Sequence, residues 1–389
     1  MSLPEKLKTV KKKKPVSNEP LWKGPCSNDA NGGITFSLLS KFLCCRERFR
    51  LNVIEGIRTV DQFNHRIQYG SMWHVCEEAH AKGQDWQVLL KNYCYELCRQ
   101  YRMQQEQVHN WWNVCKTQFP IYVDYWAKHK DVKDRTPLLQ EEVFNIPYVL
   151  PSRRIVRLRG KFDSVDLIGK GKAVGVYLQE NKSKGEIVEQ QLKRQLSFDM
   201  QTMMYLTALQ VYADESLGEA LNHAPIKGVR YNVIRRPLSG GKGSIRQHQP
   251  TKSNPSGESA EDFYRRLGGI IREEPETFFM RWLVTVSPSD IRKFRHDFLD
   301  PCLEQLCDWF SWMEYVSNSA KHDPFDKEAW ISIKTPSGER CIDSSIHYRT
   351  PYGFFNALAE SQGTDLDEYL ISGSMTGLTR VDSLFGELC

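Results

Sequence analysis

Val156-Arg157-Leu158-Arg159-Gly160-Lys161-Phe162-Asp163 alternates apolar with charged residues, the pattern of a half-buried β-strand. Ala173-Val174-Gly175-Val176-Tyr177-Leu178-Gln179-Glu180-Asn181-Lys182 follows it and is rich in residues that favour strands. Since little more than Gly169-Lys170-Gly171-Lys172 separates the two segments, we predict a β-hairpin. Neighbouring strands lie about 4.8 Å apart. The acids Asp163 and Glu180 are therefore expected close together.

The residue types at the ends of these strands suit the chemistry of a divalent metal ion. A period of two puts Glu180 and Lys182 on the same side of their strand. Carboxylates are the preferred ligands of hard divalent cations, so Asp163 and Glu180 are candidate catalytic residues and metal ligands. The carbonyl of Asn181 is a further candidate ligand. A cation and the Lys182 ammonium would together stabilise a phosphodiester and activate water for its hydrolysis. The alternative is a solvated surface hairpin with no chemical role.

A helix over residues 189–211 is predicted directly after the second strand. Gln201 and Tyr205 are four residues apart and share one face of this helix. Arg194 and Phe198 extend the same stripe toward the N-terminus, so the stripe is a candidate for binding phosphate. The alternative is that Tyr205 is half-buried and Gln201 merely exposed. We expect the core face to consist of Leu192, Leu196, Met200, Met203, Leu206 and Leu209.

Basic residues follow the second strand closely. Lys184 and Arg194 are candidate substrate-binding residues because they lie where the backbone of a substrate would run. The formal net charge of +5 is compatible with nucleic-acid binding without being diagnostic of it. The densest basic cluster is Lys11-Lys12-Lys13-Lys14, which is either part of a solvated tail or a contact for phosphates.

Four motifs in this order and spacing resemble the PD-(D/E)XK nuclease superfamily, and specifically its RecB-type branch. They are Gly70-Ser71-Met72-Trp73-His74, Gly160-Lys161-Phe162-Asp163, Glu180-Asn181-Lys182 and Gln201-Thr202-Met203-Met204-Tyr205. The segment 34–49 is also similar to the N-terminal helix of these enzymes. The resemblance covers residues from about 34 to about 212.

The resemblance implies an α/β (α+β) fold with a restriction-endonuclease-like core, in which a central mixed sheet is flanked by helices. It implies His74, Asp163, Glu180 and Asn181 as ligands of Mg²⁺, with Mn²⁺ able to substitute. It further implies a deoxyribonuclease, more often an exonuclease, acting in recombination, repair or phage genome processing, with recombination or replication proteins as candidate partners. The alternative is a non-catalytic DNA-binding or scaffolding subunit.

The cysteines argue against an iron–sulfur cluster, which some members of the family carry. Cys44 or Cys45 matches the first ligand, but the C-terminal cysteines Cys302, Cys307, Cys341 and Cys389 lack the close spacing of the other three. Cys94 and Cys98 share a helix face without a His or Cys partner nearby in the sequence, so we interpret them as buried thiols.

Composition is that of a soluble globular protein, with 389 residues, 40% hydrophobic and 26% charged. No apolar run approaches the ~20 residues that span a membrane, so no membrane association is expected. Neither a signal peptide nor a disulfide framework is recognisable among the eleven cysteines. These features favour a reducing cytoplasm, and the resemblance implies that of a bacterial or phage-infected cell.

We divide the chain into a flexible basic arm (1–33), the nuclease core with an N-terminal helical region (34–236), a mobile loop (237–260) and a helical C-terminal part packing on the core (261–389). Helices are predicted over 36–55, 66–82, 85–105, 107–129 and 291–317, the last capped by Ser289. Further strands are expected at 142–146, 228–234 and 281–286. Gly240-Gly241-Lys242-Gly243-Ser244 lacks the spacing of a phosphate-binding loop, which argues against an ATPase.

Overall fold

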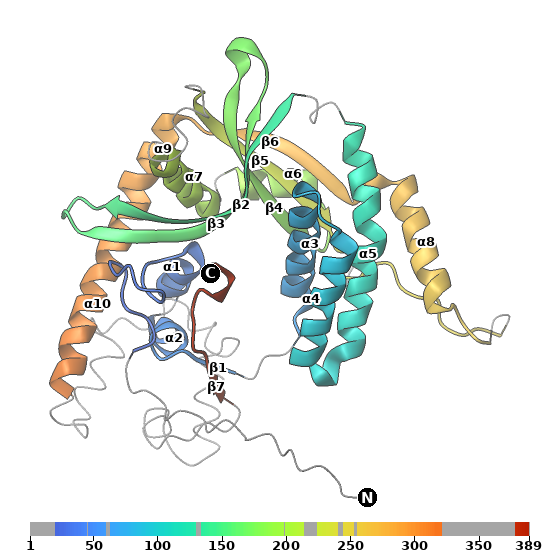
Figure 1. The fold of residues 1–389 in the computed structure, drawn as a ribbon, viewed down its shortest axis with the longest axis horizontal. Coiled ribbons are helices and arrows are strands. Elements are labelled where there is room, and N and C mark those ends of the chain that lie inside the picture. The colour runs from blue at the N-terminus through green and yellow to red at the C-terminus, as the bar shows by residue number, and fades with distance from the viewer. Residues whose placement is uncertain are drawn as a thin grey trace, which may run out of the picture.

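The computed structural model describes residues 20–44, 46–59, 63–129, 134–197, 199–213, 224–239, 244–252, 255–320 and 378–388. Its centre is a five-stranded mixed sheet with the strand order β2-β3-β4-β5-β6 (Figure 1). Only β4 and β5 are parallel; the other neighbours are antiparallel. The strands are β2 (Arg135–Val149), β3 (Ile155–Ile168), β4 (Gly175–Lys184), β5 (Ile226–Arg235) and β6 (Phe279–Thr285). The predicted hairpin and the mixed α/β sheet are therefore confirmed.

Helices cover the sheet on both faces because its strands alternate between two apolar surfaces. Val176 and Leu178 of β4 belong to the main core, which also contains residues of helix α7 (Met200–Tyr212). The same core includes side chains from five further helical elements: α1 (Phe36–Cys44), α2 (Arg46–Phe49), α6 (Glu189–Leu196), α9 (Pro288–Phe294) and α10 (Asp300–Ala320).

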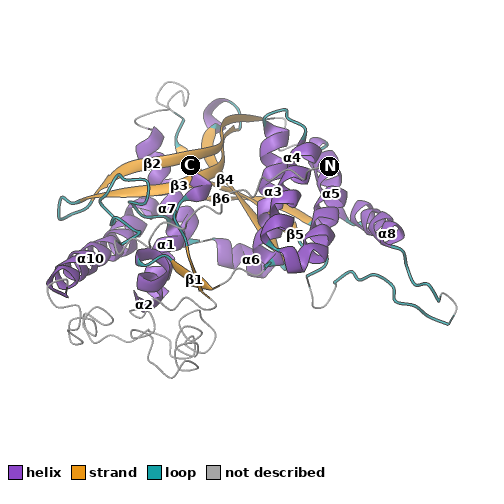
Figure 2. Cartoon of the chain, turned by 60° about the horizontal axis from the view of Figure 1, so that its bottom comes forward, coloured by secondary structure: helices purple, strands orange, loops and turns teal. Residues whose placement is uncertain are grey.

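A second core holds together the helices beside the sheet. These are α3 (His65–Ala81), α4 (Trp86–Gln100), α5 (Gln105–Ala127) and α8 (Ala260–Glu273). Figure 2 shows α3, α4 and α5 lying side by side, separated from the α1, α2 and α10 group. Phe278 and Phe279, at the start of β6, join this core. Most of the aromatic residues of α4 and α5 pack there, although Tyr95 is exposed.

One predicted helix is broken in the structure. The helix over 189–211 divides into α6 and α7, because the carboxylate of Asp199 accepts a hydrogen bond from the Thr202 N–H and starts a new helix. Periodicity alone did not reveal this break, since apolar residues continue through it. The helix predicted over 36–55 corresponds to α1, α2 and a π-helical turn, Arg50–Ile54, which follows α2 directly and is closed by a bond from Glu55 N–H to Arg50 O. Cys45, between α1 and α2, lies outside the described residues.

Other boundaries also differ from the prediction. The N-cap of α9 is Ser287 rather than Ser289, because Ser287 and Asp290 form a reciprocal capping box. A π-helical turn, Arg295–Leu299, joins α9 to α10. Met200, predicted as core, is largely exposed at the start of α7. In β2, pairing with β3 begins at Arg135, well before the predicted strand.

Part of the segment before residue 34, which we predicted to be a flexible basic arm, packs on the rest of the protein. Trp22 is completely buried and its indole N–H donates to Gly33 O at 2.8 Å. Residues 20–33 therefore pack on the core, and the prediction of a basic arm is left to residues 1–19, outside the described part. Near the other end, β7 (Leu378–Arg380) pairs with β1 (Ile57–Thr59). The described residues of the 237–259 segment form neither helix nor strand.

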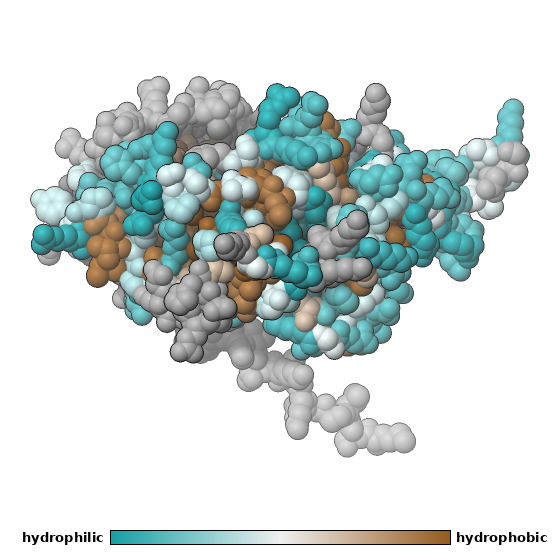
Figure 3. All heavy atoms as spheres, turned by 90° about the horizontal axis from the view of Figure 1, so that it is seen from above, coloured by the Kyte–Doolittle hydropathy of each residue, from teal (hydrophilic) through white to brown (hydrophobic). Residues whose placement is uncertain are grey.

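In the described part of the chain, no helix has both the length and the apolar character needed to cross a bilayer. Viewed from above, the surface is mainly hydrophilic, with apolar residues gathered in a few patches near its middle and at one end (Figure 3).

Candidate functional site

The site begins where strands β3 and β4 stop pairing. Their ladder runs from Ile168–Gly175 to Ser164–Gln179 and ends there. One further step of this register would set Asp163 opposite Glu180, but the two strands no longer pair at that point. In place of a ladder bond, the Asn181 N–H donates to Asp163 Oδ2 at 2.8 Å. The N–H and C=O of one strand residue point to the same side, so the Asn181 carbonyl faces the same opening.

Helix α3 places His74 over this opening. His74 Nδ1 lies 3.8 Å from Asp163 Oδ1 and 3.4 Å from Glu141 Oε1. His74, Asp163 and Glu141 each offer a ligand atom within 4.8 Å of the others. The structure thus brings together His74 and Asp163, which the sequence motifs had singled out, and adds a third acid.

Glu141 is the site residue that sequence reasoning missed. It lies on β2 opposite Asp163, since the flanking pairs are Gln140–Ser164 and Glu142–Phe162. Its backbone has a φ of 51°, which is uncommon for a residue other than glycine. Such strain is concentrated at functional sites. Its nearly buried carboxylate also accepts an ion pair from Lys161 Nζ at 2.7 Å. The only signal in the sequence is the hairpin register, which required the full extent of β2.

The Lys182 side chain contacts Glu180 and links strand β4 to helix α7 through hydrogen bonds. Its Nζ donates to Glu180 Oε1 at 2.7 Å and to Gln201 Oε1 at 3.0 Å. Asp199 Oδ2 is 3.8 Å away. Gln201 therefore holds the ammonium group in place from the helix, as its position near the start of α7 allows.

Tyr205 packs edge-on against Phe144 and Phe162, with ring centroids 5.5 and 6.1 Å apart. This contact explains the glycine of the Gly-x-x-Asp motif. A Cβ at Gly160 would come within 2.5 Å of the Phe144 ring and 3.2 Å of the Tyr205 ring. Gly160 therefore allows the helix to approach β3 closely enough for Gln201 to reach Lys182.

Burial and neighbouring charges perturb the ionisable groups of the site. Burial, against the opposing charge of His74 and together with the charges of Glu180 and Glu141, raises the pKa of Asp163 to about 7. Burial alone would lower the pKa of His74, but the charges of Asp163 and Glu141 outweigh it and raise the value to about 10. In Lys182, the charges of Glu180 and Asp199 likewise outweigh burial and raise the pKa. Carboxylates this crowded favour a bound cation.

The donor atoms fit a hard divalent cation. Glu180 is 3% exposed, yet its Oε2 has no hydrogen-bond partner among the described residues. A buried carboxylate oxygen without a partner is costly, and a metal ion would satisfy it. Carboxylate oxygens, a backbone carbonyl and one imidazole form a set of the kind that Mg²⁺ or Mn²⁺ accepts. The ligand atoms within 4.8 Å of one another are those of His74, Glu141 and Asp163, and Glu180 is not among them. That His74, Asp163, Glu180 and Asn181 share one ion therefore stays a prediction, with Glu141 as an added candidate.

A buried polar network supports Asn181 from the opposite face of the sheet. Its Oδ1 accepts from Asn232 Nδ2 at 2.8 Å, and the same amide donates to Tyr122 OH at 2.8 Å. Tyr122 OH donates to Glu77 Oε1 at 2.6 Å and accepts from Arg281 at 2.6 Å. The network ties β4 and β5 to α3 and α5, and it fixes the strand from which the Asn181 main chain faces the site.

The two predicted substrate-binding cations differ in position. Lys184 lies one strand step beyond Lys182, close enough for the Lys182 charge to help burial lower its pKa. Arg194 is exposed on α6 and separated from Gln201 by the break before α7. The predicted continuous stripe from Arg194 to Tyr205 was therefore wrong, because the two residues lie on different helices. Phe198 lies outside the described residues.

Three of the cysteines considered for a cluster lie among the described residues. Cys44 ends α1, and Cys302 and Cys307 lie on α10. Cys45, Cys341 and Cys389 are outside the described residues. The expectation that the chain binds no iron–sulfur cluster stays a prediction.

A comparison with family models adds independent evidence. Residues 34–309 match the model described as the PD-(D/E)XK nuclease superfamily, which spans β2 to β6 and all the site residues above. No curated protein matches the chain. Nucleases of this superfamily generally use divalent metal ions, in agreement with the donor set at the end of β3 and β4. On the extent of this match, the chain belongs to the PD-(D/E)XK nuclease superfamily.

Proposed function

We propose that this protein is a Mg²⁺-dependent deoxyribonuclease whose ion is bound by Asp163, Glu180, His74 and the carbonyl of Asn181. The observation that supports it most is the unpartnered Oε2 of Glu180, a buried carboxylate oxygen at the point where β3 and β4 part. Mn²⁺ would substitute for Mg²⁺, since both accept oxygen ligands.

A divalent cation at this point would stabilise charge on the phosphate and lower the pKa of a bound water. The chain's own residues then have separate tasks. Lys182, held between Glu180 and Gln201, places its positive charge 2.7 Å from Glu180 Oε1 and would orient water or stabilise the phosphate oxygens. Glu141 would keep His74 in position through its 3.4 Å contact. Tyr205 and Gln201 would shape the site and contact the nucleic acid, and Lys184 would bind the backbone beyond it.

The resemblance to the RecB-type branch is the basis for proposing DNA as the substrate and exonucleolytic cleavage as the reaction. The same resemblance supports a role in recombination, repair or phage genome processing, inside a bacterial or phage-infected cell.

The test is a cleavage assay with purified protein on linear and circular DNA, each single- and double-stranded, with Mg²⁺, Mn²⁺ or chelator. Asp163→Asn and Lys182→Ala are compared with Lys170→Ala, a change at an exposed lysine of the same hairpin. We expect metal-dependent cutting that both site variants lose and the control keeps, while all bind DNA. Cutting that persists in both site variants would refute the assignment. DNA binding without cutting under every condition would instead indicate a non-catalytic subunit.

A further inference from the structure

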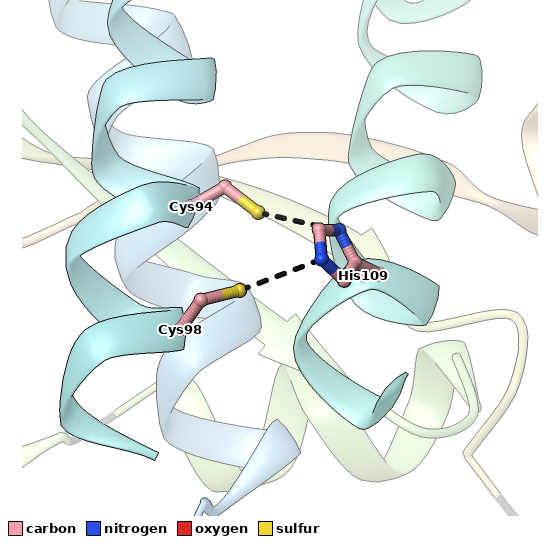
Figure 4. Close-up of side chains that lie close together, drawn as sticks. All are labelled: Cys94, Cys98 and His109. Atoms are coloured by element: carbon pink, nitrogen blue, oxygen red, sulfur yellow. Dashed lines mark hydrogen bonds between the residues drawn. The ribbon is translucent and has the colours of Figure 1, made fainter. Parts of the chain in front are cut away.

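A second cluster of metal-ligating side chains lies between helices α4 and α5. Cys94 and Cys98 are one helical turn apart on α4 and share a face. The short helical turn Arg102–Gln104 reverses the chain and brings His109 of α5 against them. In Figure 4 the two thiols and the imidazole point toward one another from the two helices. The prediction that these thiols have no His partner was therefore wrong, because the partner comes from the next helix.

The separations match those of ligands that share one ion. Cys98 Sγ lies 3.6 Å from His109 Nε2, and Cys94 Sγ lies 3.9 Å from His109 Nδ1. Metal–sulfur and metal–nitrogen bonds of about 2.3 and 2.0 Å, set at a tetrahedral angle, give a sulfur–nitrogen separation of roughly 3.5 Å. The three residues offer ligand atoms within 4.8 Å of one another. The two thiols face different nitrogens of the ring, so the imidazole would have to turn until one nitrogen faces an ion shared with both thiolates.

Burial is uneven across the cluster. Cys94 and Cys98 are only 3% and 8% exposed, whereas His109 is exposed. An ion held here would have its sulfur ligands beneath it and one side open to solvent. Within the part of the chain that the structure describes, no fourth His, Cys, Asp or Glu belongs to the cluster. The fourth coordination position of a tetrahedral ion is therefore left to water.

We propose that Cys94, Cys98 and His109 form a zinc site with three protein ligands and one water. Two thiolates and an imidazole suit Zn²⁺ and disfavour Mg²⁺, whereas the carboxylate site at β3 and β4 has the opposite preference. The chain thus carries two sites that select different metals by ligand chemistry. The thiolate site shares no ligand with the nuclease site, so a test of zinc binding does not depend on the proposed nuclease activity.

The open fourth position is the arrangement of catalytic zinc sites rather than of closed structural ones, but the place of the cluster between two helices would let an ion cross-link them. It joins α4 to α5 at the end where their connecting turn lies. These helices form one layer with α3, and Trp73, the neighbour of His74, packs on Phe119 and Tyr122 of α5 at 5.3 and 5.0 Å. A cross-link within this layer would stabilise the helices that position His74, without contacting the substrate.

The experiment uses Co²⁺ as a spectroscopic substitute for Zn²⁺. The full-length protein is stripped with chelator, kept reduced with a phosphine, saturated with Mg²⁺ to fill the carboxylate site, and titrated with Co²⁺. Thiolate-to-cobalt charge-transfer absorption reports only an ion bound to cysteine. We expect it to saturate at one Co²⁺ per chain and to disappear when Zn²⁺ is added.

Two variants locate the ion. His109→Ala removes an exposed ligand and should leave the fold intact, as circular dichroism would verify. Cys98→Ser removes a buried one. Both should lose the absorption and the rise in melting temperature with Zn²⁺, while Cys302→Ser, a change at a thiol on α10, should keep both. Absence of the absorption in the folded wild type would overturn the proposal. So would an unchanged absorption in folded His109→Ala, which decides the matter even if Cys98→Ser fails to fold.

Discussion

Replacing Asp163 by Asn should stabilise the metal-free protein while abolishing metal-dependent cleavage. The carboxyl of Asp163 is 14% exposed, and burial among other acids raises its pKa from 3.8 to about 7. Between pH 3.8 and about 7, Asp163 binds more protons in the folded state than in the unfolded state, so the free energy of unfolding falls as the pH rises through this range. Each tenfold change in proton affinity is 1.36 kcal/mol, so ionised Asp163 costs the fold on the order of 4 kcal/mol above pH 7. Asn resembles the neutral acid and escapes this cost.

Urea unfolding in the presence of chelator measures the effect. The free energy of unfolding of Asp163→Asn should exceed that of the wild type by up to about 4 kcal/mol at pH 8, and by close to nothing near pH 4. Asp166→Asn is the matched control on the same strand. Asp166 is fully buried and ion-paired with Arg135 at 2.8 Å and Arg230 at 3.1 Å, so its loss should destabilise by about 3–5 kcal/mol. An Asp163→Asn protein that is less stable than the wild type at pH 8 would refute this electrostatic reasoning.

Three further predictions concern the same site. Glu141→Gln should weaken metal binding about 10- to 100-fold. Glu142→Gln should have little effect, because the Glu142 side chain accepts a hydrogen bond from a tyrosine hydroxyl instead. Calorimetric titration with Mn²⁺ compares the two variants. Mg²⁺ binding should release protons and become stronger as the pH rises through 7. The ion needs neutral His74, which has a pKa of about 10, and ionised Asp163, which has a pKa of about 7. Binding heats that are identical in buffers of different ionisation enthalpy would contradict this prediction. Lys182→Ala should lower kcat by about 10²–10³ with DNA affinity unchanged, and a proportional loss of both would indicate a binding role.

The sheet and most of the candidate site follow from the sequence because they depend on local patterns. Alternation predicted β3, and the short connection predicted its hairpin with β4, so Asp163 and Glu180 were expected to be neighbours. Glu141 was not predictable in this way, since its place depends on the β2–β3 register and on a left-handed backbone conformation. His109 likewise meets Cys94 only through the packing of two helices.

The sequence pattern did not predict where the helix over residues 189–211 is interrupted. Apolar residues recur at helical spacing on both sides of residues 197–199, and only the side-chain cap made by Asp199 ends that continuity. The consequence for function is direct. Gln201 and Tyr205 share the new helix and reach the site, while Arg194 belongs to the preceding one. The Asp199 cap sets where α7 begins, a local signal that the spacing of apolar residues does not show.

The central claim is that one divalent cation binds between Asp163 and Glu180. Anomalous diffraction from crystals grown with Mn²⁺ tests it most directly. The account predicts a single strong peak at about 2.0–2.6 Å from oxygens of both carboxylates, with the Asn181 carbonyl and a His74 nitrogen in the same coordination shell. Crystals that bind Mn²⁺ only elsewhere, with the Asp163 and Glu180 oxygens too far apart to share an ion, would contradict it.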